Sequence, residues 1–157
     1  MRLFVDNNTV GIICELDTEA DGVDLTRDEL GLRILEAGIR GIRSSILIGR
    51  DPATGQVWAP LRPSTVRAKD HATVGYRTGA MFGSDFSTEG AEVDARRASW
   101  GFPGPRGKIE SFHNGNDITQ KARPLVGWSP TAAEEVKQLL RDADRFSATR
   151  YGLESFQ

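Results

Sequence analysis

Two segments of the chain carry apolar residues at the spacing of an α-helix. In the first segment an apolar residue recurs every three or four positions, at Leu35, Ile39, Ile42 and Ile46. The second segment keeps the same spacing with Ala133, Val136, Leu140 and Ala143. Because such a stripe covers a core along one face of a helix, we predict helices over residues 25–48 and 129–146. We expect Ile39, Ile42 and Ile46 to face a sheet.

Both predicted helices have start signals, and the first also has a stop signal. Thr26 and Glu29 match a capping box, in which the Thr side chain accepts from the backbone and the Glu reaches back. Gly49, just before Asp51-Pro52, is typical of a helix end. Ser129-Pro130 opens the second helix with a capping Ser and with Pro at the first position, where its missing N–H costs nothing.

Three glycines interrupt the first predicted helix, at Gly31, Gly38 and Gly41. Each costs roughly 1 kcal/mol in a helix interior compared with Ala. Since such costs need an offset, we predict that another element packs closely against this helix.

Shorter patterns predict strands. Residues 3–16 read as a strand pair joined by a polar Asp-Asn-Asn-Thr turn. Residues 84–100 read as a β-hairpin around Glu89-Gly90, since apolar and polar residues alternate after that turn. Residues 125–128 form a short apolar run that we interpret as a further strand. The predicted fold class is α+β, a small antiparallel sheet packed by a long helix in the N-terminal half and a C-terminal helix, with long loops.

The remaining segments read as connections. Residues 51–75 are predicted to form an extended arm and loop, because two prolines within residues 56–65 exclude a helix there, with Trp58 and Leu61 as anchors to the core. Residues 147–157 have no periodicity and are predicted to form a tail. A chain of 157 residues has the length of one ordinary domain, so we expect residues 1–157 to be a single domain.

Charge and cysteine usage narrow the function classes. The formal net charge is −2, whereas a dedicated nucleic-acid binder usually has a basic excess. No apolar run is long enough to span a membrane. Cys14 is the single cysteine, which excludes an internal disulfide. It lies in an apolar run, where we expect an inert, buried thiol.

Little in the sequence points to catalysis. The two histidines, His71 and His113, have no partner at metal-ligand spacing. We therefore predict no enzymatic activity, no cofactor and no metal site, although an enzyme of unrecognised type stays an open alternative. A second alternative is a small nucleic-acid-associated binding module. Its basic residues would be Arg62, Arg67, Lys69 and Arg77, with Trp58 and Tyr76 nearby for stacking on bases.

A succession of short motifs is more informative than any one of them. An Asp-Pro-x-Thr-Gly-x-x-Trp-x-Pro-Leu-x-x-Ser-Thr segment begins at Asp51, and Arg-Thr-Gly-Ala-Met begins at Arg77. Phe-His-Asn-Gly follows at Phe112, and Ala-Arg-Pro-Leu-Val-Gly-Trp-Ser at Ala122. Between about residues 25 and 140 this succession resembles the tailed-phage virion morphogenesis proteins, a family of tail-completion and head–tail joining proteins.

The resemblance implies a structural virion protein rather than an enzyme. It implies a neck or tail-completion subunit that acts in head–tail joining, assembles in the host cytoplasm and resides in the neck or tail of the virion. The implied partners are further copies of the chain in a homo-oligomeric ring and other phage neck, connector or tail proteins. Proximity to DNA in the channel is left open, and no membrane is involved.

The resemblance also singles out residues. The motif positions to which it gives a structural role are Trp58, Pro60, Leu61, Thr65, Thr78, Gly79, His113, Gly115, Arg123 and Pro124.

Three arginines of the first predicted helix, Arg33, Arg40 and Arg43, lie on other faces than the apolar stripe. They are candidates for a subunit interface with acidic stretches at residues 17–24 and 89–94, since complementary charges set the register of such contacts.

Overall fold

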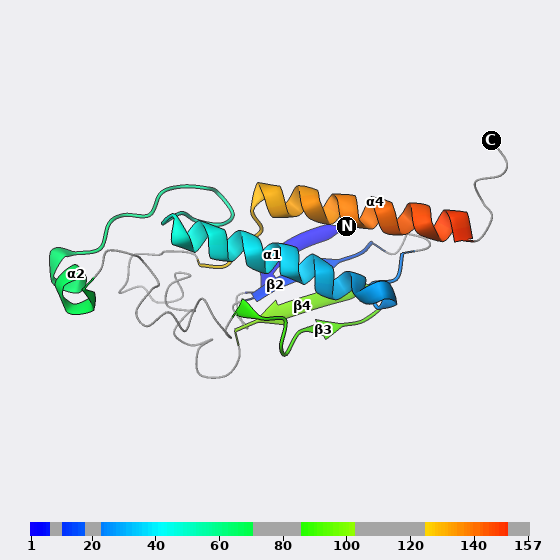
Figure 1. Cartoon of the computed structure of the whole chain (residues 1–157), viewed down its shortest axis with the longest axis horizontal. Coiled ribbons are helices and arrows are strands. Elements are labelled where there is room, and N and C mark those ends of the chain that lie inside the picture. Colours follow the sequence, from blue (N-terminus) through cyan, green and yellow to red (C-terminus); the bar gives the residue numbers. More distant parts are fainter. Residues whose placement is uncertain (7–10, 18–22, 71–85, 103–124, 151–157) are drawn as a thin grey trace.

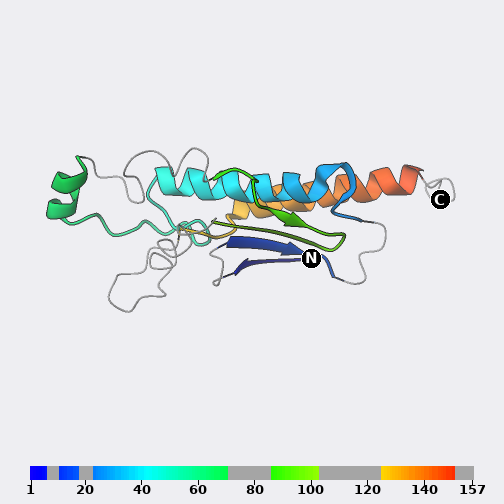
Figure 2. The ribbon, with the colours of Figure 1, turned by 90° about the horizontal axis from the view of Figure 1, so that it is seen from below.

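The computed structural model describes residues 1–6, 11–17, 23–70, 86–102 and 125–150. A four-stranded antiparallel sheet, in the order β1-β2-β4-β3, forms one layer, and α1 and α4 lie together on one of its faces (Figures 1 and 2). The predicted α+β class, with a small antiparallel sheet covered by two helices, is confirmed.

The predicted strand pair within residues 3–16 is present. β1 (Arg2–Asp6) pairs with β2 (Gly11–Glu15), with Leu3 opposite Cys14. β2 also pairs with β4 (Arg97–Gly101) and is therefore a central strand. Ile12, Ile13 and Cys14 are each at most 2% exposed, so both faces of β2 are shielded from water at these positions, which explains the continuous apolar run.

A hairpin is present within residues 84–100, but its turn follows Val93 and does not lie at Glu89-Gly90 as predicted. The observed hairpin joins β3 (Glu92–Val93) to β4. Its turn forms because Asp94 Oδ1 accepts from the backbone N–H groups of Arg96 and Arg97, both at 2.8 Å. Gly90, with φ of +77°, does form a turn, but that turn leads into β3 rather than closing the hairpin.

Helix α1 (Leu30–Leu47) begins later than predicted, after the short 3₁₀ turn η1 (Arg27–Glu29). The expected capping box is absent, because both Thr26 donors, the backbone N–H and Oγ1, are taken by Asp24 Oδ1 at 2.9 and 2.6 Å. Asp28 and Glu29 then adopt left-handed backbone conformations, with φ of 49° and 56°. A regular helix can start only after them.

The end of α1 is where the sequence predicts it. Gly49 has φ of +70°, and its N–H donates to the Ile46 carbonyl at 3.1 Å. The Arg50 N–H donates to the Ser45 carbonyl at 2.9 Å. These two hydrogen bonds make a Schellman motif, which satisfies carbonyls that the last helical turn leaves free.

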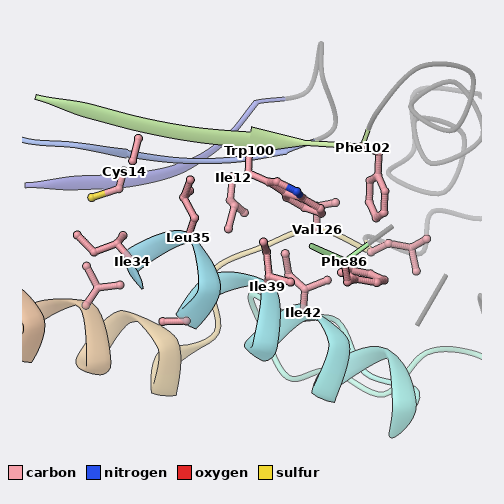
Figure 3. Close-up of a cluster of buried hydrophobic side chains, with 14 of the residues drawn as sticks. Ile12, Cys14, Ile34, Leu35, Ile39, Ile42, Phe86, Trp100, Phe102 and Val126 are labelled. Carbon is pink, nitrogen blue, oxygen red and sulfur yellow. The ribbon is translucent and has the colours of Figure 1, made fainter. Parts of the chain in front are cut away.

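The core lies between α1 and the sheet. Every member of the predicted stripe is buried, namely Leu35, Ile39, Ile42 and Ile46. Figure 3 shows Leu35, Ile39 and Ile42 directed toward the sheet residues Ile12 and Trp100. Full burial of one such side chain stabilises the fold by about 1.5–3 kcal/mol, so this stripe is a main source of stability.

The predicted close packing at the helix glycines is confirmed. A Cβ on Gly38 would lie 2.4 Å from Ile12 Cδ1, and one on Gly41 would lie 2.7 Å from Ser129 Oγ. Gly31 is equally crowded. The glycines therefore let α1 approach the sheet on one side and the start of α4 on another.

Helix α4 (Pro130–Arg150) runs antiparallel to α1 (Figure 1). It starts as predicted, since Ser129 Oγ accepts from the Ala132 N–H at 3.1 Å. It continues four residues beyond the predicted end at residue 146, into the segment predicted as a tail. The sequence Ser-Ala-Thr-Arg at those positions contains no helix breaker, so nothing ends the helix there.

Residues 125–128 are not a strand, contrary to the prediction. Leu125 and Val126 are buried, but the segment lies outside the sheet. The Trp128 side chain, through Nε1, donates to the Phe4 carbonyl of β1 at 3.2 Å. The apolar run thus marks burial rather than strand pairing, a distinction that a short run cannot make.

The predicted arm and loop over residues 51–75 contains a helix, α2 (Pro63–Lys69). The prediction that two prolines exclude a helix here is therefore wrong. Pro63 occupies the first turn, where a missing N–H is tolerated, and Arg62 before it is extended. Residues 71–75 lie outside the described residues. α2 lies beyond the C-terminal end of α1, apart from the sheet (Figures 1 and 2).

Candidate functional site

The chain turns back sharply after α1, at what we call the arm root (residues 47–58). Asp51 Oδ1 accepts from the Ala53 N–H at 2.8 Å, and the Gly55 N–H donates to the Asp51 carbonyl at 2.8 Å. Gly55 has φ of +70°, which favours glycine. The turn directs the following residues back along the end of α1, where Val57 forms a β-bridge with Arg50. The Asp-Pro-x-Thr-Gly motif is therefore a turn that orients the arm.

Trp58 fixes the arm (residues 59–70) to the body of the protein, by which we mean the sheet together with α1 and α4. Its side chain is only 8% exposed, and its backbone N–H donates to the Gly49 carbonyl at 2.9 Å. The anchor role predicted for Trp58 is confirmed. Its indole Nε1 is buried and has no hydrogen-bond acceptor among the described residues. An unsatisfied buried donor of this kind costs about 1–3 kcal/mol, so packing outweighs hydrogen bonding at this anchor.

The other motif residues of the arm are placed differently from one another. Leu61 is partly buried and packs against the core, as predicted. Pro60 is exposed, and Thr65 lies half-buried on α2. The structural roles predicted for Thr78, Gly79, His113, Gly115, Arg123 and Pro124 stay predictions, because these positions lie outside the described residues.

Three apolar residues of the arm root are exposed, Leu47, Ile48 and Val57, at 57%, 64% and 65%, and we call them the apolar patch. Sequence reasoning missed it. One signal was available, because Leu47 and Ile48 follow directly after Ile46 and so fall off the buried stripe. The exposure of Val57 depends on the β-bridge with Arg50, which no sequence periodicity reveals.

The arginines proposed as an interface are not equivalent. Arg40 donates to Glu135 Oε1 of α4 at 2.5 Å and lies 4.0 Å from Glu36. Arg33 and Arg43 are exposed and make no ion pair with a described residue. Arg40 therefore links the two helices of one chain, whereas the other two guanidinium groups stay available to a partner.

The acidic stretches proposed to face those arginines are also partly engaged. Asp17 binds the N-terminal amine of Met1, which lowers the pKa of its carboxyl, and it lies 3.7 Å from Arg2. Asp94 holds the β3–β4 turn through the hydrogen bonds described above. Residues 18–22 lie outside the described residues. Asp17 and Asp94 thus have structural roles within the chain.

The described titratable groups show no nucleophile poised for reaction. Burial raises the pKa of the Cys14 thiol to about 12, so the thiolate that would react is scarce at neutral pH. Among residues that the structure describes, no three or more His, Cys, Asp or Glu side chains gather where they could hold a metal ion. No described helix is both long and apolar enough to cross a bilayer.

Comparison with known proteins adds no relative. No protein-family model matches the chain, and no curated protein and no solved structure matches it. A functional proposal therefore rests on the motif succession in the sequence and on the geometry of the arm and its root.

Proposed function

We propose that this protein is a structural virion protein of a tailed bacteriophage, a neck or tail-completion subunit that acts in head–tail joining as a homo-oligomeric ring. In this proposal it is not an enzyme and needs no cofactor. Its partners are its own copies and neighbouring neck, connector or tail proteins. The order of motifs from Asp51 to Ser129 supports the class.

The observation that carries the proposal is the projecting arm. The chain leaves the body after Leu61, which still packs against the core, and continues into α2, which lies apart from the sheet (Figure 2). The turn at Asp51 and the bridge between Arg50 and Val57 fix the direction in which the arm leaves. A helix of only seven residues has little stability of its own in water. Such an arm suits a subunit that must reach a neighbour.

Loss of function in the phage that encodes the chain tests this proposal. A nonsense mutation should give filled heads and separate tails, and supplying the wild-type chain from a plasmid should restore joined particles. Antibody detection should find the protein in purified virions. Absence from virions, or normal infectious yield without the protein, would contradict the proposal.

An arm variant makes the test specific. Replacing residues 63–69 with a Gly-Ser linker of equal length should leave the body folded, since α2 lies outside the core, but should not restore joining. Circular dichroism of the purified variant checks the fold. DNA binding that weakens steeply as salt rises would instead favour the nucleic-acid-associated module.

A further inference from the structure

Helix α1 carries opposite charges at its two ends. At its C-terminal end Arg43 and Arg50 are exposed. At its N-terminal end Asp28 and Glu29 are exposed and make no ion pair with a described residue. We call these two carboxylates the acidic tip. Figure 1 shows the two ends far apart along the longest axis of the molecule.

The arginines flank the apolar patch of Leu47, Ile48 and Val57. Arg43 precedes Leu47 by one helical turn, so the two side chains are neighbours on the helix surface. Arg50 is the bridge partner of Val57. An apolar centre with a charged rim is the usual composition of a protein–protein contact. Two exposed arginines against the single carboxylate of the arm root, Asp51, give the rim a net positive charge, so an acidic surface matches it.

The acidic tip is a suitable counterpart in the same chain. Arg27, which precedes Asp28 in the sequence, lies 3.6 Å from Asp24 and is engaged by that carboxylate. Arg33 is one turn further along α1. The arm of another copy is a poor occupant, because its exposed Arg62 and Arg67 would meet the basic rim with like charge.

We infer that the apolar patch and its flanking arginines bind the acidic tip of a second copy of this chain. The inference deepens the proposed function and rests on it for the closed ring. Because patch and tip lie at opposite ends of α1, each copy uses one surface to bind and the other to be bound. Such a heterologous contact closes into a ring when its rotation allows, and otherwise continues as a filament.

Sedimentation velocity on the full chain, over a range of concentration and salt, tests the contact. The wild type should associate, and less so at high salt because exposed charges are screened. The double substitution Ile48→Thr and Val57→Thr should weaken association at least about tenfold, since central apolar contacts carry most interface energy. Phe4→Thr is the matched control, because Phe4 is an exposed apolar residue of β1, outside patch and tip.

Charge reversal separates the contact from simple misfolding. One variant combines Arg43→Glu with Arg50→Glu, and the other combines Asp28→Lys with Glu29→Lys. Neither should associate alone, but an equimolar mixture should, because each variant then presents a charge that the other complements. A misfolded variant could not be rescued in this way.

Some results would overturn the inference. These are a wild type that stays monomeric at every concentration, or association that survives the reversals and the patch substitutions. The outcome is independent of the phage experiment. Association through the patch with normal joining would remove only the function in joining, whereas failed joining in the null mutant with a monomeric chain would remove this contact and the ring but keep the role in joining.

Discussion

The body and the arm root use glycine for different reasons. In the body, Gly38 leaves no room for a side chain, since a Cβ would lie 2.4 Å from Ile12 Cδ1. At the arm root, Gly49 has φ of +70° and no atom within 4 Å of the place a Cβ would take. Glycine is therefore needed in the body because no volume is left for a side chain, and at the arm root because the backbone conformation there has a positive φ.

Isoleucines on and just after α1 show the same division. Ile42 is 0% exposed and lies in the core, whereas Ile48, at the C-terminal end of the helix, is 64% exposed. The body uses its apolar side chains for folding. The arm root leaves comparable side chains uncovered, which is the condition expected of a binding surface. This contrast gives predictions of different size for the two regions.

The largest effect is expected for Ile42→Asp. It buries an unpaired carboxylate in the core, so we expect a loss of more than about 4 kcal/mol and an unfolded chain. The same substitution at Ile48 is the matched control and should change stability by only about 0.5 kcal/mol. Thermal melts followed by circular dichroism measure both. Equal melts for the two variants would remove the contrast between the regions.

Trp58 connects the two regions, and its ring rather than its N–H should matter. We expect Trp58→Ala to cost about 3–5 kcal/mol, because it empties the anchor site. Trp58→Phe keeps an aromatic ring and removes a donor with no acceptor among the described residues, so it should cost less than about 1.5 kcal/mol. Urea titration of both variants checks this. A cost for Phe close to that for Ala would reveal an acceptor for the indole N–H.

Gly38→Ala tests whether volume governs the body. Alanine improves helix propensity by about 1 kcal/mol, yet the clash with Ile12 should produce a net loss of about 1–2 kcal/mol. Adding Ile12→Val removes the nearer obstructing group and leaves Trp128 Cζ3, 2.8 Å from the Cβ position, so the double variant should be less destabilised than the sum of the singles. Additive costs in urea titrations would show that the clash is relieved elsewhere.

Those parts of the fold that follow from local patterns along the chain could be predicted from the sequence, whereas those that depend on particular side-chain hydrogen bonds could not. The stripe around Ile42 and the crowded Gly38 were predicted because helical periodicity and glycine cost are local properties. The start of α1 was not, since Asp24 competes with the backbone for Thr26. Local side-chain hydrogen bonds of this kind decide between alternatives that look equal in sequence. The same competition at Asp94 moved the hairpin turn.

The candidate site divides in the same way. Trp58 was predicted as an anchor because a large aromatic between turn residues and prolines has few other roles. The patch residue Val57 was not predicted, since its exposure follows from a bridge to Arg50 that forms only in the folded chain. Arg40 was assigned to a subunit interface, whereas in the structure it pairs with Glu135 of the same chain. The sequence could not reveal this pair, because the two residues are 95 positions apart.

A smaller effect concerns pH. The side-chain and backbone hydrogen bonds from Thr26 lower the pKa of Asp24 in the folded chain. These hydrogen bonds to the ionised Asp24 carboxylate stabilise the folded chain at pH values above the pKa of an aspartate in the unfolded chain, about 3.9. This contribution is lost as the pH falls through the lower pKa that Asp24 has in the folded chain. Thr26→Ala removes the first cause, so the Asp24 midpoint measured by NMR should rise. Thr131→Ala, an exposed change on α4, should leave it unmoved.

The smallest effect should come from the ion pair between Arg40 and Glu135. Both side chains are largely exposed, at 58% and 45%, and exposed pairs are worth about 0.2–1 kcal/mol. A double-mutant cycle with Arg40→Ala and Glu135→Ala should therefore give a coupling in that range. Arg40→Glu should cost more than Arg40→Ala, because it places like charges beside Glu135 and Glu36. Combining it with Glu135→Arg should recover stability.

The same variants separate the intrachain role of Arg40 from a role in assembly. If Arg40 acts only between α1 and α4, the reversed pair should restore both the melting temperature and the self-association of the chain. If Arg40 also contacts a neighbouring copy, stability should return while association stays weak, because the guanidinium has moved to α4. Arg43→Glu provides the comparison, since Arg43 has no ion-pair partner among the described residues and should alter association with little effect on melting.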